Sequence, residues 1–339
     1  MEKIKSLILR ITERCNLKCT YCYAAAQPKP DMTCEMAIKI VQLCCEPGDS
    51  LHIQFTGGEP LLNFKVIEDV YNFGKKTDRK LILAIQTNGT LLTPEICRKL
   101  HQFQCGIGVS LDGIGKENCF RMFSDGRPAY EEIANGIHNL ANENLKCNIT
   151  TVISSANAEN LSKILDASLY FGNIAGIGLD LCRPIGRASL RDCSPSTENL
   201  SKGLTKLILK YKELRKIGIP IHLREWDRIT NRHLYPTDDC IYCYAQTEKS
   251  LAVDGYGDCY PCSSLMGFSS CFLGNIKDGL PTLKRSCLDL NPPDKCIKCP
   301  EFNLCKGGCP AMRINSPKNI NSLTCQMHNI FSKEWEENL

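Results

Sequence analysis

The sequence lacks a strong excess of charge, a long apolar segment and an export signal. Its 41 basic and 37 acidic residues leave a formal net charge of +4 over 339 residues, so it has no polybasic character of the kind that binds nucleic acid or anionic membranes. No apolar run approaches the roughly 18 residues of a membrane span. Arg10 interrupts the short apolar stretch 6–9, unlike in a signal peptide. These absences predict a cytoplasmic protein that binds neither nucleic acid nor membrane.

Histidine is scarce, with six residues, and none is paired with an acid or a nucleophile at a spacing typical of catalysis. Cysteine, in contrast, occurs 23 times. Disulfides are disfavoured in a reducing cytoplasm, and an odd number argues against complete pairing. Metal ligation, iron–sulfur ligation and catalytic thiols remain. Several cysteines nevertheless occupy apolar positions of predicted strands and helices and are expected in the core: Cys44, Cys97, Cys105 and Cys147.

The first part of the chain alternates short apolar strands with amphipathic helices. The strands are rich in Ile, Leu and Val, as buried parallel strands are. One helix begins at Thr93-Pro94, which reads as an N-cap followed by proline at the first helical position. Six βα units in succession predict an α/β fold, a parallel barrel or an open sheet, with its site beyond the carboxyl ends of the strands. The predicted strands are 6–12, 51–55, 81–87, 106–111, 148–154 and 176–181.

The pattern changes near residue 195. Residues 200–217 read as a single basic helix, and from Cys240 to Cys325 regular periodicity fades while eleven cysteines accumulate. This last region is expected to bury little apolar surface, so its order should come from bound metal. The sequence therefore predicts a βα domain over 1–195, a bridging helical segment over 196–239 and a small irregular domain over 240–339.

Two motifs follow the first two strands. Cys15, Cys19 and Cys22 have the spacing C-x3-C-x2-C, and three thiolates can hold three irons of a cubane while leaving the fourth iron open. Half a zinc site and chance spacing are the alternatives. The second strand ends in the segment 57–60, Gly-Gly-Glu-Pro, where glycines let a ligand approach the backbone and proline fixes the turn. An ordinary loop is the alternative there.

Together these residues, with Tyr21 before the third cysteine, resemble the radical S-adenosylmethionine (SAM) superfamily. The resemblance implies a partial (β/α)6 barrel and a [4Fe–4S] cluster on Cys15, Cys19 and Cys22, whose open iron binds SAM. An electron from a donor such as flavodoxin or ferredoxin would then cleave SAM to a 5′-deoxyadenosyl radical. The implied SAM contacts are Tyr21 beside the adenine, and Gly57, Gly58 and Glu59 at the methionyl amino group.

The ends of the third and fourth strands, 86–90 and 110–113, resemble segments of the branch of this superfamily that modifies peptides and proteins. Ser110 and Arg121 are candidates for the SAM carboxylate, because a hydroxyl and a guanidinium suit a carboxylate. An Asx-Gly turn and a solvated arginine are the alternatives. Residues 181–187 also resemble the family and are expected only to line the pocket.

The C-terminal cysteines follow the pattern Cys243-x13-Gly257-x4-Cys262, then a four-cysteine core, then Cys325. A zinc site with four thiolate ligands is the alternative, but the pattern contains seven cysteines, which is more than one zinc ion binds. The pattern resembles the SPASM extension of radical SAM enzymes, which implies two auxiliary [4Fe–4S] clusters. The first would take Cys243, Cys262, Cys309 and either Cys240 or an open iron, with Cys259 as a rival of Cys240; the second would take Cys296, Cys299, Cys305 and Cys325.

The resemblance implies an oxidoreductase that modifies a side chain of a ribosomally made peptide or protein, by a thioether or carbon–carbon crosslink or by oxidation. Formylglycine formation in sulfatases is less favoured, because Ser263 stands where that branch has an acid. Tetrapyrrole modification and a non-catalytic electron carrier remain as alternatives. Because the first strand begins close to residue 1, we expect no peptide-binding domain before it, and we expect a separate leader-binding protein or the barrel rim to hold the substrate. The acidic candidates for substrate contact, each more simply a solvated surface residue, are Glu225, Asp227 and Asp239.

Overall fold

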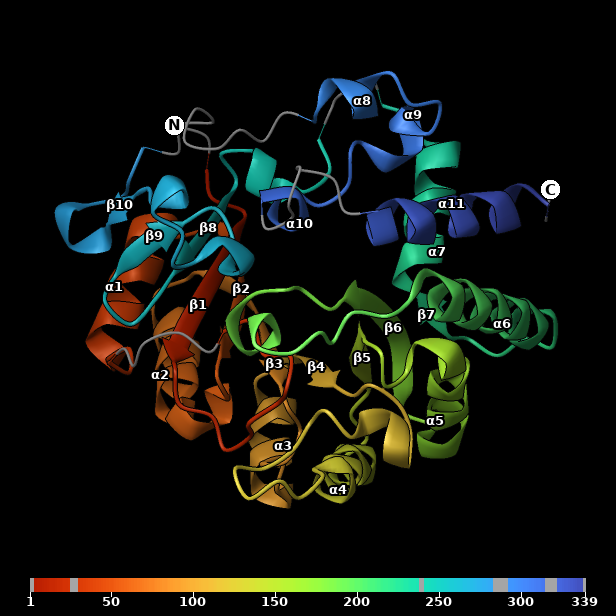
Figure 1. The fold of residues 1–339 in the computed structure, drawn as a ribbon. Coiled ribbons are helices and arrows are strands. Elements are labelled where there is room, and N and C mark those ends of the chain that lie inside the picture. The colour runs from red at the N-terminus through yellow and green to blue at the C-terminus, as the bar shows by residue number, and fades with distance from the viewer. Residues whose placement is uncertain (1–2, 25–29, 238–240, 283–291, 315–321, 338–339) are drawn as a thin grey trace.

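The structure, a computed structural model, describes residues 3–24, 30–237, 241–282, 292–314 and 322–337. Its centre is one sheet in the order β10-β9-β8-β1-β2-β3-β4-β5-β6-β7, and Figure 1 shows helices α1 to α5 packed along one side of it. The strands are β1 (Ser6–Thr12), β2 (Ser50–Gly57), β3 (Lys80–Thr87), β4 (Gly106–Ser110), β5 (Cys147–Ile153), β6 (Ile174–Leu181), β7 (His222–Leu223), β8 (Ser250–Val253), β9 (Asp258–Tyr260) and β10 (Gly274–Asn275).

The predicted run of six βα units is confirmed. Neighbouring strands from β8 through β1 to β7 are all parallel, and the first six begin and end within about three residues of their predicted positions. The helices are α1 (Cys34–Cys44), α2 (Phe64–Lys76), α3 (Pro94–Gln102), α4 (Tyr130–Asn142), α5 (Lys163–Phe171), α6 (Thr197–Lys216), α7 (Arg224–Leu234), α8 (Asp294–Ile297), α9 (Phe302–Cys305), α10 (Pro310–Ile314) and α11 (Ser322–Glu336).

Local signals in the sequence explain where the longer helices begin. Thr93 caps α3 as predicted, since its side chain accepts a hydrogen bond from the Ile96 amide and Pro94 is the first helical residue. Ser196 caps α6 in the same way at the Asn199 amide. The predicted single helix over 200–217 is therefore confirmed, with its start three residues earlier.

The four cysteines expected in the core are confirmed there. Cys44, Cys97, Cys105 and Cys147 are all buried, Cys97 completely. Burial raises the pKa of the Cys147 thiol to about 12, so the side chain is a neutral thiol at neutral pH and packs as a small apolar group. These thiols contribute to the barrel's apolar core.

The C-terminal region packs more apolar surface than the sequence predicts. All four residues of β8 are buried, and β8 pairs in parallel with β1 through the register Leu7 with Leu251 and Leu9 with Val253. A separate apolar cluster contains Ala252, Tyr260, Leu265, Met266, Cys271 and Ala311. The expectation that this region buries little apolar surface is thus wrong, because 250–275 completes the sheet.

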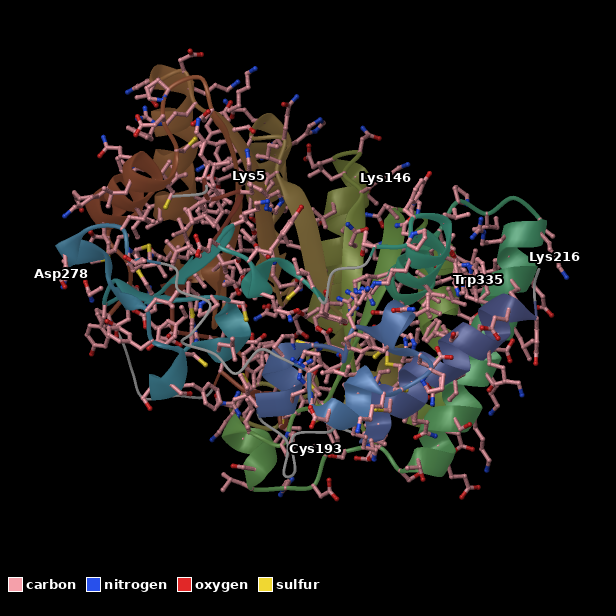
Figure 2. All side chains as sticks on the ribbon, turned by 90° about the horizontal axis from the view of Figure 1, so that it is seen from above. Lys5, Lys146, Cys193, Lys216, Asp278 and Trp335 are labelled. Atoms are coloured by element: carbon pink, nitrogen blue, oxygen red, sulfur yellow. The ribbon has the colours of Figure 1, made fainter. Side chains whose placement is uncertain are left out.

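The last helix, α11, lies against α6 and α7. Its Trp335 indole donates to the Thr230 hydroxyl at 2.8 Å, and Lys212 pairs with Glu334 at 2.8 Å. In Figure 2 the labelled Trp335 and Lys216 lie at the same end of the molecule. Among the described residues, no helix combines the length and the apolar character needed to cross a membrane.

Candidate cofactor site at the strand ends

A cavity of about 350 Å³ lies at the carboxyl ends of the parallel strands. It is bounded by the loop after β1, the ends of β2 to β6, the segment after β6, and Ser263 with Ser264. Of the residues predicted to hold the first cluster and SAM, those that line it are Cys15, Cys19, Cys22, Tyr21, Gly57, Gly58, Ser110 and Arg121. Glu59 does not belong to this lining.

The cysteine loop after β1 is held by backbone hydrogen bonds from two directions. The amides of Lys18 and Thr20 donate to the carbonyls of Met122 and Phe120 at 2.7 and 2.9 Å. On the other side Arg187 donates to the loop through its amide, to Cys22 O at 3.0 Å, and through its Nε, to Cys19 O at 2.8 Å. The predicted role of 181–187 as pocket lining is confirmed, and Arg187 also supports the loop.

The three thiols of this loop are available as ligands without converging on one point. Cys15 is exposed, Cys22 is half-buried and Cys19 is buried, and burial raises the pKa of Cys19 to about 11. Within the described ranges, no group of three or more His, Cys, Asp or Glu side chains converges on a single metal ion. In a cubane each thiolate binds a different iron, so ligands spread along one loop fit that group.

Gly57 and Gly58 are required by the neighbouring backbone. A Cβ on Gly57 would lie 2.2 Å from the Thr12 carbonyl oxygen, and one on Gly58 would lie 2.3 Å from that of Arg14. The Gly58 and Glu59 amides donate to these same two carbonyls at 2.8 Å. The glycines thus let the end of β2 pack onto the cysteine loop. Both also line the cavity, and their contact with the methionyl amino group stays a prediction.

Glu59 is fully buried and its carboxylate is occupied by donors of the protein. Oε1 accepts from the Leu61 amide at 3.1 Å and from the Thr87 hydroxyl at 2.7 Å, and Oε2 accepts from the Asn88 amide at 2.7 Å. This geometry turns the carboxylate toward the end of β3, so Glu59 joins two strand ends instead of reaching the cavity. The predicted contact with the methionyl amino group stays a prediction.

Burial raises the pKa of Glu59 to about 7, although three hydrogen bonds oppose the shift. Between its ordinary pKa of 4.5 and about 7, the folded protein keeps a proton that the unfolded chain releases. Stability from this group is thus present at low pH and lost as pH rises through 7. We expect the unfolding free energy of the wild type, relative to Glu59→Gln, to fall by about 1 kcal/mol from pH 6 to pH 8. Thermal unfolding of both proteins at each pH measures this, and a constant difference would contradict it.

Arg121 is buried beside Tyr21 and Asp112, which makes the solvated-arginine alternative wrong. Its Nη2 donates to Asp112 Oδ1 at 3.0 Å, the Tyr21 hydroxyl donates to the same carboxylate, and the guanidinium lies 5.5 Å from the centre of the Tyr21 ring. Its Nε is buried with no hydrogen-bond partner in the described part of the chain. Arg121 and Ser110 both line the cavity, and a guanidinium near a hydroxyl suits an anionic ligand such as a carboxylate.

Sequence reasoning missed several polar residues of the cavity. Gln54, Thr150 and Asp180 project into it from β2, β5 and β6, and the signal that could have revealed them is a polar residue inside an apolar strand. Arg224 offers no such signal, because it enters the cavity from α7 across the space left by Gly178, where a Cβ would lie 2.8 Å from its guanidinium. Asp180 is the one carboxylate among the described lining residues, and it pairs with Arg224 at 2.9 Å.

The described C-terminal cysteines form two groups. Burial and the nearby thiols of Cys309 and Cys243 together raise the pKa of Cys262 to about 12. In the second group, Cys325 and Cys296 act in the same way on Cys305, whose pKa burial raises to about 11, and Cys296 and Cys299 act on Cys325. These neighbours agree with the two sets that the resemblance implies, and the ligation itself stays a prediction. Cys240 lies outside the described residues.

The chain reverses between the two groups. Lys306, Gly307 and Gly308 all have positive φ, at 52°, 74° and 69°, so the peptide turns sharply between Cys305 at the end of α9 and Cys309 before α10. Two cysteines only four residues apart therefore join different groups. Glycine adopts such a conformation without steric cost, which explains Gly-Gly in this position.

One remaining candidate ligand and three candidate substrate contacts were also predicted from the sequence. Cys259 is fully buried, donates to the Gly257 carbonyl and lies near Cys44, so the structure groups it with α1 and not with Cys262. Glu225 is buried and pairs with Arg224, which makes its solvated-surface assignment wrong, because Arg224 and the Leu179 amide satisfy its carboxylate. Asp227 is partly exposed beside His222, and Asp239 lies outside the described residues.

The sequence of this chain is similar to those of radical SAM proteins. The family model of the radical SAM superfamily matches residues 9–167. An uncharacterized protein of Methanocaldococcus jannaschii is 33% identical over 280 residues, which cover 82% of this chain and 91% of that protein. The radical SAM cyclopropyl synthase TigE of Paramaledivibacter caminithermalis is 26% identical over 91% of this chain and 68% of its own length.

Similarity to the cysteine-type anaerobic sulfatase-maturating enzyme of Clostridium perfringens extends over nearly the whole chain. The two sequences are 23% identical over 98% of this chain and 96% of that enzyme. A solved structure of anSMEcpe with bound AdoMet and the Cp18Cys peptide matches with a TM-score of 0.84 at 24% identity, and covers 99% of this chain and 98% of the other. The barrel and the cysteine-rich region thus share one fold with that structure.

Proposed function

The chain belongs to the radical SAM superfamily, and from this premise we propose that it modifies a side chain of a ribosomally made peptide or protein. Its fold is that of the anaerobic sulfatase-maturating enzymes with their SPASM domain, and its family uses SAM and [4Fe–4S] clusters. The observation that supports the proposal most is the cavity itself, because it brings three cysteines of one loop together with a buried, partly unsatisfied guanidinium.

In this proposal Cys15, Cys19 and Cys22 hold the SAM cluster. A cluster held by these residues would supply the electron that cleaves bound SAM, and with it the radical chemistry that would remove hydrogen from a substrate. Arg121 and Ser110 bind the SAM carboxylate, and Asp112 fixes the orientation of Arg121 through the 3.0 Å hydrogen bond. Gly57 and Gly58 hold the end of β2 against the cluster loop, and Tyr21 forms the wall beside the adenine.

The two C-terminal cysteine groups hold auxiliary clusters. Cys243, Cys262 and Cys309 bind the first, with Cys240 as the proposed fourth ligand, and the other four bind the second. The grouping by mutual proximity supports this assignment. A separate donor such as flavodoxin or ferredoxin supplies the electron, and the reducing cytoplasm, which keeps thiols free, suits such a protein.

The products that we propose are a thioether or carbon–carbon crosslink or an oxidised side chain. Formylglycine formation is less favoured, because Ser263 and Ser264 line the cavity beside Cys262 where the resemblance leads one to expect an acid. Asp180, which also lines the cavity, is instead the carboxylate positioned to accept a substrate proton. A leader peptide binds either at the barrel rim or on a separate protein.

Reconstitution under anaerobic conditions tests this function in two steps. Three cubanes give about twelve irons per chain, and SAM should change the EPR signal of the reduced protein, since only an open iron can bind it. Candidate peptides encoded near this gene are then incubated with the enzyme, SAM and reductant, and their masses are measured. Four irons together with zinc would contradict the SPASM clusters. Full iron and normal deoxyadenosine formation, with a modified tetrapyrrole and unmodified peptides, would contradict the peptide substrate.

A further inference from the structure

A closed ring of hydrogen bonds lies beside the first cysteine of the loop after β1. Asn88, directly after β3, donates through Nδ2 to Asn16 Oδ1 at 2.9 Å. Asn16 Nδ2 donates to the Thr90 hydroxyl at 2.8 Å, and that hydroxyl donates to Asn88 Oδ1 at 2.7 Å. Each member therefore donates one hydrogen bond and accepts one, all in the same direction around the ring, so the three bonds strengthen one another.

The orientation of the Asn88 side-chain amide is determined by a backbone group. The Thr90 amide donates to Asn88 Oδ1 at 2.9 Å. A backbone N–H can only donate, so the atom that faces it is the side-chain oxygen, and the side-chain nitrogen faces the other way. The backbone of Asn88 is held as well, because its own amide donates to Glu59 Oε2 at 2.7 Å. Asn88 is buried, so water competes little for these contacts.

The second N–H of this amide is used at Cys15. Nδ2 carries two hydrogens, and the ring uses one of them. Asn88 Nδ2 also donates to the Cys15 sulfur at 3.8 Å, and the Leu17 amide donates to the same sulfur at 3.4 Å. The sulfur of the first predicted cluster ligand is therefore an acceptor for two N–H groups of the protein.

Asn88 also lines the cavity at the strand ends, so a direct contact with SAM is the alternative role. The hydrogen bonds of the side chain argue against that role. Oδ1 accepts from the amide and the hydroxyl of Thr90, and the two N–H groups of Nδ2 donate to Asn16 and Cys15. An asparagine side chain has two donor and two acceptor positions, so the protein itself occupies all four.

We infer that Asn88 raises the reduction potential of the cluster that Cys15 is proposed to bind, and that Thr90 holds the Asn88 amide in place for this. The inference rests on the proposed function, because it takes Cys15 as a ligand of the SAM cluster. Reduction adds one electron to a [4Fe–4S] cluster, so the ligand sulfurs become more negative. A hydrogen bond to such a sulfur stabilises the reduced cluster more than the oxidised one, which makes the cluster easier to reduce.

An anaerobic redox titration of the reconstituted protein, without SAM and followed by EPR, tests the inference. The signal of the first cluster is the part of the reduced spectrum that is missing when all three cysteines of its loop are replaced by alanine. Asn88→Leu removes the donor and keeps a side chain of similar size. We expect the ratio of reduced to oxidised cluster at a fixed potential to fall about tenfold, as for the loss of one hydrogen bond to a charged group. For one electron this is a shift of about 59 mV to more negative potential.

Further variants assign the shift to the ring and keep the test valid if Asn88→Leu does not fold. Thr90→Val removes the hydroxyl that holds Asn88 and should lower the ratio by a smaller factor, about threefold, because the backbone amide of residue 90 still holds Oδ1. Thr90→Ser keeps the hydroxyl and should have the parental potential. The matched control is Asn173→Leu before β6, which removes a buried amide that donates to the Ile137 and Leu145 carbonyls; it should leave the potential unchanged.

The outcomes separate this inference from the proposed function. A parental potential in both Asn88→Leu and Thr90→Val, a shift to more positive potential, or an equal shift in Asn173→Leu would overturn the inference and leave the proposed function in place. A shift that appears only after SAM is added would show that Asn88 acts on SAM, and would overturn it as well. No peptide is present in the titration, so failure to modify peptides would contradict the proposed function and leave a measured shift standing.

Discussion

Replacing Cys15, Cys19 and Cys22 together by alanine is expected to abolish reductive SAM cleavage while leaving about eight of twelve irons bound. The loop that carries these residues is held by the Met122 and Phe120 carbonyls and by Arg187, none of which depends on the thiols. The barrel should therefore fold in the variant. Iron analysis together with deoxyadenosine measurement after dithionite reduction checks both parts.

The control for this experiment is a thiol outside all three proposed clusters. Cys34 at the start of α1 is half-buried and its thiol lies beside Asp69 of α2, so Cys34→Ala should keep full iron and full SAM cleavage. Deoxyadenosine formed at the normal rate by the triple variant would refute the assignment of this loop. Loss of all twelve irons would show that the auxiliary clusters depend on the first one.

Cys309→Ala should remove the first auxiliary cluster, about four irons, and loosen the segment from Cys296 to Cys325. Cys309 lies with Cys243 and Cys262, while Cys305, across the sharp turn at Lys306, belongs to the second group. Its ligation would therefore connect the first group to the segment that carries α8 and α9, two short helices with no buried residue. Iron counting and limited proteolysis on the reconstituted variant measure the two effects.

Cys259→Ala is the matched control, because it removes a cysteine only three residues from Cys262 that lies beside Cys44 instead. It should keep all its iron, with at most a loss of stability from the small cavity that it leaves in the core. If Cys309→Ala keeps full iron and parental protease resistance, the crossed ligation is wrong. If Cys259→Ala loses four irons, Cys259 is a ligand after all.

Local chemistry explains why much of the barrel could be predicted from the sequence. The strands β1 to β6 are short runs rich in Ile, Leu and Val, although in β2 to β5 buried residues alternate with half-buried or exposed ones. The Thr93-Pro94 cap marks the start of α3. The cysteine spacings were equally informative, since they are unusual even in a cysteine-rich chain. Cys240 and Asp239 lie outside the described residues, so their surroundings stay predictions.

The features of the structure that could not be predicted from the sequence depend on contacts between distant segments. No local pattern pairs β8 with β1, which are more than 240 residues apart in register Ser6 with Ser250. Glu59 was expected at the ligand, yet its surroundings are set by Thr87 and Asn88 from the next strand end. The direction of a side chain such as Cys259 follows from the pleat of β9, and a shift of one residue would reverse it.

The parallel pairing of β8 with β1 also governs how the protein must be made. During synthesis β1 emerges early, with Leu7 and Leu9 fully buried only in the finished fold, and one of its edges has no partner until residues 250–253 leave the ribosome. An apolar strand with an open edge is a template for pairing with other chains. A nascent chain or a fragment ending before β8 therefore carries an aggregation-prone edge, which the last third of the chain covers.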